Sequence, residues 1–265
     1  MKLCHLALAI MVAVPAWAGA IVYSSLPAPL PPNQPSIGYE ASGISEFGDL
    51  VQLANGPADL LSATVGMSDW APESDWSGDI GQTLGGSTLT SAGFDIDLTL
   101  NLYDVNAGDS VGSLIGSYTV DASIPWRPAP GGGCPNNGWL ASDGCHSGSL
   151  STVTFELPNV SVPDEFIYGL AFNTADYGYF PTGVDGPYES LNFAVTLSAP
   201  SAGSNPQGGQ GYASAASPPM SSTDTGGYIG EIEFDAAPEP ASTTLAGLGL
   251  LGLCLGLRRG RRRAR

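Results

Sequence analysis

The sequence predicts an all-β fold, most simply a two-sheet β-sandwich of the jelly-roll type. Several short runs alternate apolar with polar residues, and Gly, Pro, Asn or Asp bounds each run. Between the two chain ends, no segment repeats its apolar residues at the period of an α-helix. The length of 265 residues suits one large β-domain with targeting ends, so we expect a single domain over residues 37–236.

The clearest strand runs from Phe94 to Leu102, where apolar and polar residues strictly alternate. That pattern places one set of side chains on a core and the other in solvent. Turn-forming residues 106–109 precede a second β-rich run over 111–120, so the pair predicts a β-hairpin. Further strands are expected at Leu50–Leu53, Leu60–Met67, Ser151–Leu157, Phe166–Phe172, Leu191–Leu197 and Tyr228–Phe234.

Two segments lack the character of core strands. Residues 21–36 contain five prolines, which favour either an extended, polyproline-like spacer or a first edge segment. Residues 199–227 are dominated by Ser, Gly, Pro and Ala, so we expect a long flexible loop before the last strand.

Charge is distributed very unevenly along the chain. All 25 acidic residues lie between Glu40 and Glu239, whereas Arg127 is the only basic residue between Lys2 and Arg258. Residues 19–240 therefore carry one positive against 25 negative charges, a net charge of −24. Such a surface repels phosphates, which excludes nucleic acid as a partner. The acidity serves solubility outside the cell or, alternatively, the collection of cations.

The N-terminus has the organisation of a secretory signal peptide over residues 1–20. Lys2 precedes an apolar run from Leu6 to Val14, and residues 16–18 supply a small-x-small cleavage site. We expect a signal-peptide helix, cleavage after Ala18 or Ala20, and export by the Sec machinery.

The C-terminus combines a short motif, an apolar span and a positive stop. Pro238, Glu239 and Pro240 precede residues 241–257, which carry no charge. A helix of that length rises about 25 Å, so we expect a single transmembrane helix. The Arg-rich residues 258–265 would hold its far end in the cytoplasm and leave the domain outside.

This tail, residues 238–265, resembles the PEP-CTERM sorting signal of Gram-negative bacteria, whose members are processed by the membrane transpeptidase exosortase. The resemblance implies export to the cell envelope, cell surface or extracellular matrix, with exosortase as a partner. The alternative is an ordinary tail anchor. Short strings in the domain are similar to those of an uncharacterised family of secreted β-domains, which implies no activity. The sorting residues that the motif designates are Pro238, Glu239, Pro240, Arg258, Arg259, Arg261, Arg262 and Arg263.

Cys134 and Cys145 lie in a Gly-rich segment, and export to an oxidising compartment predicts a disulfide between them. Closing a loop of this size stabilises a protein by about 3 kcal/mol in the chain-entropy model. The alternative adds His146 to the two thiols as a zinc site, for which no fourth ligand is evident.

Asp104, Asn106 and Asp109 alternate oxygen-bearing side chains, as at the start of a calcium loop. The downstream Glu of an EF-hand is missing, and Asp and Asn favour turns without a metal. Calcium is therefore the only cofactor considered, in a structural role, and the alternative is a plain hairpin turn.

Ser110 lies in a G-x-S-x-G pattern, and Asp143 and His146 would complete a Ser-His-Asp set. The chemistry requires the serine on a turn leading into a helix, whereas Ser110 lies between two predicted strands. With 25 carboxylates, no glycosidase pair can be singled out. We therefore expect no catalytic residue and no enzyme, with a polysaccharide or ester hydrolase as the remote alternative.

Aromatic residues gather in or near the predicted loops. Exposed rings there would stack on sugars, as in carbohydrate-binding sandwiches, and the alternative is that they plug the core or anchor loops. The rings are Trp70, Trp76, Trp126, Trp139, Tyr177, Tyr179 and Tyr188, of which Trp126, Trp139, Tyr177 and Tyr179 are the ligand-binding candidates.

The predicted function follows mainly from the resemblance of the tail. We expect a surface- or matrix-sorted structural protein, associated with exopolysaccharide or biofilm and without catalytic activity. An extracellular carbohydrate-binding module is the alternative, and a secreted hydrolase is the second one.

Overall fold

The computed structural model describes residues 19–84, 87–172, 190–214 and 220–238. Residues Ala20–Ala236 form one compact unit. Its strands are accompanied only by a short α1 (Tyr39–Ser42) and a 3-10 turn η1 (Glu73–Trp76), so the all-β prediction is confirmed. In the described part of the chain, no helix is long and apolar enough to cross a membrane. The predicted signal-peptide core, transmembrane span and Arg cluster all lie outside the described residues.

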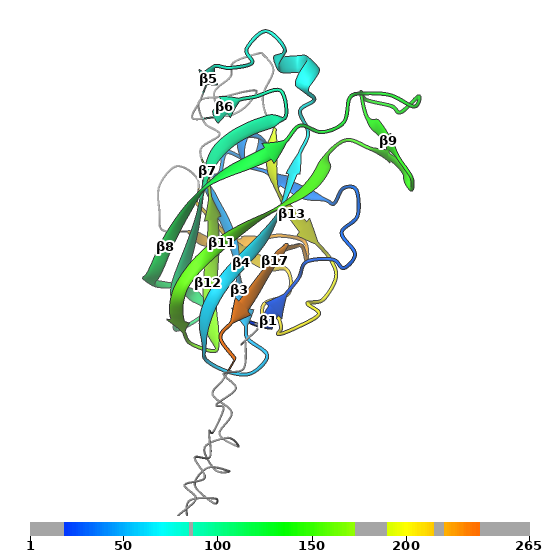
Figure 1. The fold of residues 1–265 in the computed structure, drawn as a ribbon. Coiled ribbons are helices and arrows are strands. Elements are labelled where there is room, and N and C mark those ends of the chain that lie inside the picture. The colour runs from blue at the N-terminus through cyan, green and yellow to red at the C-terminus, as the bar shows by residue number, and fades with distance from the viewer. Residues whose placement is uncertain (1–18, 85–86, 173–189, 215–219, 239–265) are drawn as a thin grey trace, which may run out of the picture. The chain divides into compact units, whose positions relative to one another are not determined.

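The strands form two large sheets and one hairpin, and every pairing between them is antiparallel (Figure 1). The first large sheet consists of β1 (Ala20–Ser24), β17 (Ile232–Ala236), β4 (Ala58–Asp69), β13 (Leu191–Thr196) and β16 (Ile229–Gly230), with β11 (Ser149–Val162) and β2 (Ser36–Gly38) attached. The second consists of β15 (Ser221–Asp224), β14 (Gln210–Ser214), β3 (Glu46–Gln52), β12 (Glu165–Ala171), β7 (Gly93–Asn106), β6 (Ser87–Leu89) and β5 (Thr83–Leu84), with β8 (Ser110–Pro125) attached. The separate hairpin pairs β9 (Trp139–Ala141) with β10 (Gly144–His146).

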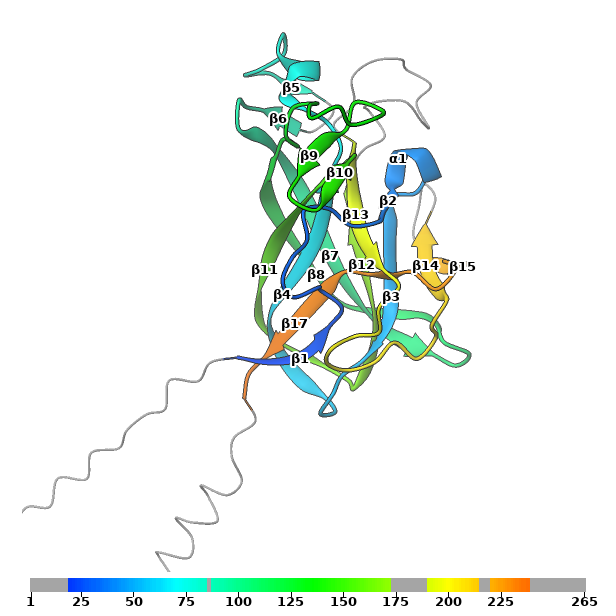
Figure 2. The same ribbon diagram turned by 90° about the vertical axis from the view of Figure 1, so that its right-hand side faces the viewer.

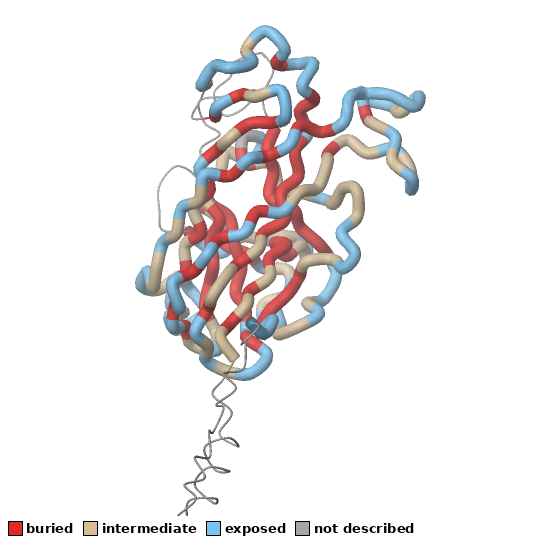
Figure 3. Tube along the Cα trace, in the orientation of Figure 1, coloured by how far each residue is buried: buried red, intermediate tan, exposed pale blue. Residues whose placement is uncertain are grey.

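Aromatic rings join the two large sheets across the core. Phe166 of β12 packs edge-on against Phe234 of β17 with ring centroids 5.3 Å apart, and Phe47 of β3 meets Phe193 of β13 at 6.1 Å. All four rings are buried, and Figure 3 shows the buried segments along the strands of both sheets. Burying such a side chain stabilises the fold by about 1.5–3 kcal/mol, so these contacts hold the sheets together as a sandwich. Its jelly-roll order remains a prediction.

Each predicted strand is present in the structure, and the predicted β7–β8 hairpin is confirmed. The five apolar residues that alternate along β7 are all buried. At the hairpin turn, Gly108 and Asp109 adopt positive φ angles of 73° and 55°. Glycine takes this conformation freely and Asp tolerates it, which explains why the chain reverses here.

The proline-rich segment 21–36 begins with a strand, so the spacer prediction is wrong for its first residues. β1 lies at the edge of the first sheet beside β17, as Figure 2 shows, and the edge-segment alternative fits it. Tyr23 is fully buried, because its ring packs near Phe234 of the core at 6.3 Å. Further along, Pro32 and Pro35 accept backbone hydrogen bonds from β11 and β13.

The flexible-loop prediction for residues 199–227 is wrong where β14 and β15 lie. β14 pairs with β3, and Tyr212 of β14 is fully buried beside Leu50. A Gly- and Ser-rich strand offers no apolar pattern to detect, but its backbone still fills the hydrogen-bonding edge of a neighbouring strand.

Candidate functional site

Residues 128–148 leave the sandwich as an arm that carries the β9–β10 hairpin and extends away from the large sheets (Figure 1). A disulfide joins Cys134 to Cys145, whose Cα atoms lie 5.5 Å apart, so the predicted bond is confirmed. The bond ties the Gly-rich first half of the arm to β10. With both sulfurs in the disulfide, no thiolate is left to bind zinc, which overturns the zinc alternative.

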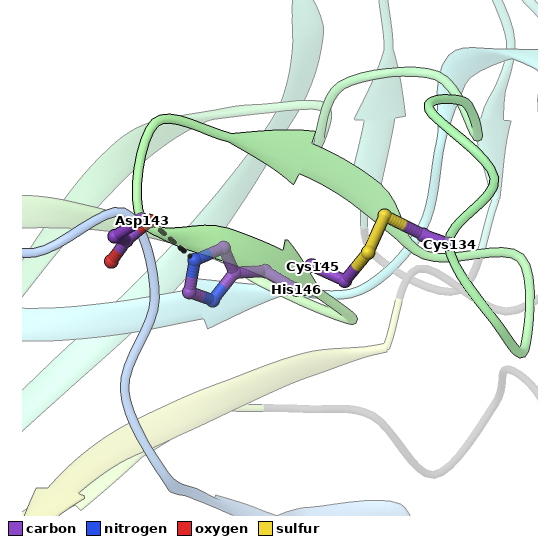
Figure 4. Close-up of a disulfide and its surroundings, with 4 residues drawn as sticks. All are labelled: Cys134, Asp143, Cys145 and His146. Carbon is purple, nitrogen blue, oxygen red and sulfur yellow. Dashed lines mark hydrogen bonds and ion pairs between the residues drawn. A yellow bond between two sulfur atoms is a disulfide. The ribbon is translucent and has the colours of Figure 1, made fainter.

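The arm also carries the Asp143–His146 pair. Nε2 of His146 lies 2.8 Å from Oδ1 of Asp143, and this hydrogen bond lowers the pKa of the Asp143 carboxyl. Figure 4 shows the His146 ring pointing toward Asp143, while the neighbouring Cys145 points toward Cys134. The ring of Trp139 packs on His146 at 5.6 Å, so the pair is part of the hairpin's own packing.

A buried polar corner forms the base of the arm. Asp69, the last residue of β4, accepts hydrogen bonds from the backbone N–H groups of Ala71 and Arg127. The Arg127 side chain is 6% exposed, and its Nε donates to the carbonyl oxygen of Trp70. Burial lowers the pKa of Arg127, while the carboxylates of Asp75 and Asp69 oppose that effect. Arg127, the only Lys or Arg residue between Lys2 and Arg258, therefore connects the end of β4 to the end of β8.

Two tryptophans, Trp70 and Trp139, contact Gly148 beside this corner. Nε1 of Trp139 donates to the carbonyl oxygen of Gly148 at 2.8 Å. A Cβ on Gly148 would lie 2.5 Å from two atoms of the Trp70 ring, so that ring packs directly on the glycine backbone. Trp70 is 42% exposed, whereas Trp139 is half-buried.

Trp126, a predicted ligand-binding residue, lies instead in the core. It is 9% exposed, stacks near Trp76 at 6.3 Å and packs on Phe94 at 5.1 Å. Its Nε1 donates to the carbonyl oxygen of Thr90. Trp126 and Trp76 are thus core plugs. Tyr177, Tyr179 and Tyr188 lie outside the described residues.

The Ser-His-Asp set is not assembled. Ser110 begins β8 at the hairpin turn, and its Oγ contacts the carbonyl oxygen of Ala107. The arm with His146 starts beyond the opposite end of the same ribbon, where Gly93 pairs with Pro125. A ribbon of 14 residues spans roughly 45 Å, so Ser110 and His146 lie at opposite ends of it.

A cleft with a volume of about 620 Å³ lies beside the hairpin turn. Its wall is fixed by Gln207, whose Nε2 donates to Oδ2 of Asp109 at 2.7 Å, and by Tyr212, whose hydroxyl donates to the Asp109 carbonyl oxygen. The cleft is lined by Gly108, Asp109, Ser110, Val111, Gln207, Gln210, Met220, Ser221 and Ser222.

Two of the predicted calcium ligands, Asn106 and Asp109, form hydrogen bonds of their own at this turn. Nδ2 of Asn106 donates to the carbonyl oxygen of Val111, and the carboxylate of Asp109 accepts from Gln207. Over the residues that the structure describes, no three or more His, Cys, Asp or Glu side chains gather as a metal site would require. The calcium site stays a prediction.

Residues 236–263 match the family model of the PEP-CTERM protein-sorting motif. The chain carries a PEP-CTERM sorting signal. The rest of the chain has no family assignment, and no curated protein or solved structure matches it. A PEP-CTERM signal indicates an exported protein that exosortase processes and that is sorted to the cell envelope.

The PEP-CTERM motif begins where the folded unit ends. β17 finishes at Ala236, the first matched residue, and Pro238 is the last described one. Glu239, Pro240 and the designated arginines lie outside the described residues. Ala236 pairs with Ala20 of β1, so both expected processing points border the paired strands β1 and β17.

The sequence reasoning missed the roles of Arg127 and Gly148. The signal for Arg127 was that it is a lone cation in an acidic domain. A buried arginine must be paired, and the many carboxylates of the domain offer such partners. Nothing in the sequence marks Gly148 among 36 glycines, since its importance comes from the two indoles that meet it.

Proposed function

We propose that this protein is a non-catalytic structural component of the cell surface or extracellular matrix, delivered by exosortase processing of its PEP-CTERM tail and associated there with exopolysaccharide. The observation that carries the proposal is the motif match over residues 236–263. Its start at the last residue of β17 supports it further, because a cut near Pro238–Pro240 leaves every strand of the sandwich intact.

The remaining geometry is consistent with a protein that persists outside the cell. The arm is closed by a disulfide, which an oxidising environment maintains. The domain is strongly acidic, and Arg127, its only Lys or Arg residue, is buried. The resulting net negative charge of the surface favours solubility and resistance to aggregation. A hydrolase finds no support at Ser110, which lacks both a histidine nearby and the strand-to-helix turn.

The experiment is the intact mass of the mature protein from its own host, in the medium and in the envelope. We expect a mass without the residues before Gly19 or Ile21, without the residues after the Pro-Glu-Pro region, and two hydrogens light. Glu239→Ala should leave the full tail in place, whereas Glu156→Ala, at an exposed carboxylate of β11, should be processed normally. A mature wild-type protein that retains Arg258–Arg265 would overturn the proposal in favour of a plain tail anchor.

A further inference from the structure

We propose that Trp70, at the base of the disulfide arm, is the platform on which an uncharged polysaccharide stacks. The inference deepens the proposed function by naming the class of polymer, and it depends on that function only for where the polymer is met. Trp70 directly follows β4 and is 42% exposed, whereas Trp76 and Trp126 are buried. An exposed indole offers a broad apolar face, which suits the CH face of a pyranose ring.

Contacts on several sides hold the indole in place before any ligand arrives. The carbonyl oxygen of Trp70 accepts a hydrogen bond from Nε of the buried Arg127. Nε1 of Trp70 donates to Oγ of Ser68 at 3.1 Å, and that hydroxyl donates to Oδ1 of Asn33 at 2.8 Å. An aromatic side chain that is already fixed loses little conformational entropy on binding, so its contact area converts efficiently into affinity.

Gly148 packs against the same edge of the ring and helps to set its position. A Cβ at this position would come within 2.5 Å of Cδ1 and Nε1 of Trp70 and of Oγ of Ser68. The backbone of Gly148 is fixed in turn, because its carbonyl oxygen accepts the Nε1–H of Trp139. The platform thus joins β4, β11 and the arm at one place, and the disulfide keeps the arm in its folded form.

The charge of the domain selects the class of polymer. Arg127 is the only basic residue between Lys2 and Arg258, and it is buried. No exposed Lys or Arg of the described domain can therefore neutralise a uronate, sulfate or phosphate group, and the net negative charge repels polyanions. An uncharged hexose polymer meets no such repulsion. The side-chain amide of Asn33, next to the indole edge, offers hydrogen bonding to its hydroxyls.

The test is affinity electrophoresis of the mature protein in native gels that contain one polymer each. Hydroxyethyl cellulose and galactomannan serve as uncharged polymers, and alginate serves as the anionic one. We expect at least one uncharged polymer to retard the wild-type protein, and alginate to leave its mobility unchanged. Because stacking on one aromatic ring commonly changes affinity by tenfold or more, Trp70→Ala should weaken the retardation at least tenfold.

Matched variants separate stacking from general loss of structure. Trp70→Phe keeps a smaller ring and should restore part of the binding, while Gly148→Ala should weaken it by displacing the ring. Leu197→Ala removes another exposed apolar side chain, 63% exposed, and should bind as the wild type does. Thermal unfolding of each variant checks that the sandwich remains folded.

Tryptophan emission gives a second measurement. Adding the retarding polymer should shift the emission of the wild type and of Leu197→Ala but not that of Trp70→Ala. The inference is overturned if neither uncharged polymer retards the protein, if folded Trp70→Ala binds as tightly as wild type, or if alginate binds best. These outcomes leave the sorting and exosortase processing in the proposed function untouched, because processing is read from the mass of the protein in its host.

Discussion

Two regions of the molecule each bury an aspartate completely, in different surroundings. One is the corner where β4 meets the end of β8, and the other is the middle of β3. Asp69 at the corner accepts two backbone N–H groups and has Arg127 as its neighbour. Asp49 of β3 accepts the N–H of Leu50, and its Oδ2 has no hydrogen-bond partner among the residues that the structure describes. The amide of Asn205 lies near that carboxyl, but without hydrogen-bonding geometry.

The difference shows two ways in which a protein accommodates a buried carboxyl group. At the corner, donors and a cation favour the charged form and fix the chain around it. In the middle of β3, burial raises the pKa of Asp49 to about 7, so that protonation removes the charge instead. Glu231 is fully buried, and its carboxylate has no hydrogen-bond partner within the described part of the chain. It behaves as Asp49 does, and burial raises its pKa to about 7.

Removing the corner carboxylate should have the largest effect. Asp69→Ala leaves the backbone N–H groups of Ala71 and Arg127 without their acceptor and removes one of the two carboxylates near Arg127, so we expect a loss of about 3–5 kcal/mol in the free energy of unfolding. Denaturant unfolding measures it. Asp59→Ala, at an exposed site on the same strand, should change stability by less than about 0.5 kcal/mol. Equal losses in the two variants would show that the corner is not special.

Titration of stability sharpens the contrast from the side of Asp49. Its folded pKa of about 7 lies above its ordinary value of 3.8, so the folded state binds more protons between these values. The contribution of Asp49 to stability is therefore fully present below about pH 4, falls as pH rises toward 7, and levels off above it. The fall amounts to at most about 4 kcal/mol, because one pKa unit corresponds to about 1.4 kcal/mol.

Asp49→Asn should flatten this profile, leaving the part that Glu231 contributes, whereas Asp59→Asn should leave its shape unchanged. Chemical unfolding at a series of pH values provides the measurement. A profile of Asp49→Asn that retains the full wild-type slope between pH 4 and 7 would count against neutralisation in the core.

Breaking the disulfide tests whether the corner can hold the arm without it. In the Cys134→Ser, Cys145→Ser double variant, we expect the arm to lose about 3 kcal/mol of local stability. Chymotrypsin should then cut at Trp139 or Leu140 much faster than in the wild type, while the sandwich keeps its melting temperature. Unchanged resistance of the arm to cleavage would mean that the corner and the Trp139–Gly148 hydrogen bond are sufficient.

The smallest effect compares two buried tyrosine hydroxyls. Tyr39 donates to the carbonyl oxygen of Leu170 at 2.6 Å, whereas the hydroxyl of Tyr168 in the core has no hydrogen-bond partner in residues 19–84, 87–172, 190–214 and 220–238. Tyr39→Phe should lower the free energy of unfolding by about 1 kcal/mol, and Tyr168→Phe should be neutral or slightly stabilising. Thermal unfolding of the two variants side by side decides, and the reverse order would contradict the difference in pairing.

Patterns along the chain sufficed for the parts of the protein whose physics is local. The alternation in β7, the turn residues before β8 and the cysteine spacing predicted a hairpin and a disulfide that the structure contains. The PEP-CTERM tail is likewise readable, because its motif, apolar span and Arg cluster are adjacent in sequence. Composition misled for β1, β14 and β15, where Pro, Gly and Ser conceal strands that a neighbouring edge stabilises.

By itself, the sequence determined the all-β class, the β7–β8 hairpin, the disulfide and the presence of the PEP-CTERM sorting signal. Only the tertiary structure decided which aromatic rings are buried and which are exposed. The sequence places both Trp126 and Trp70 in or near predicted loops, yet Trp126 is buried and Trp70 is exposed. The tertiary structure alone brought Trp70, Gly148 and Trp139 together, and it separated Ser110 from His146. The physical reason is that strand periodicity and short motifs act over neighbouring residues, whereas burial and pairing depend on segments about a hundred residues apart that only packing brings into contact.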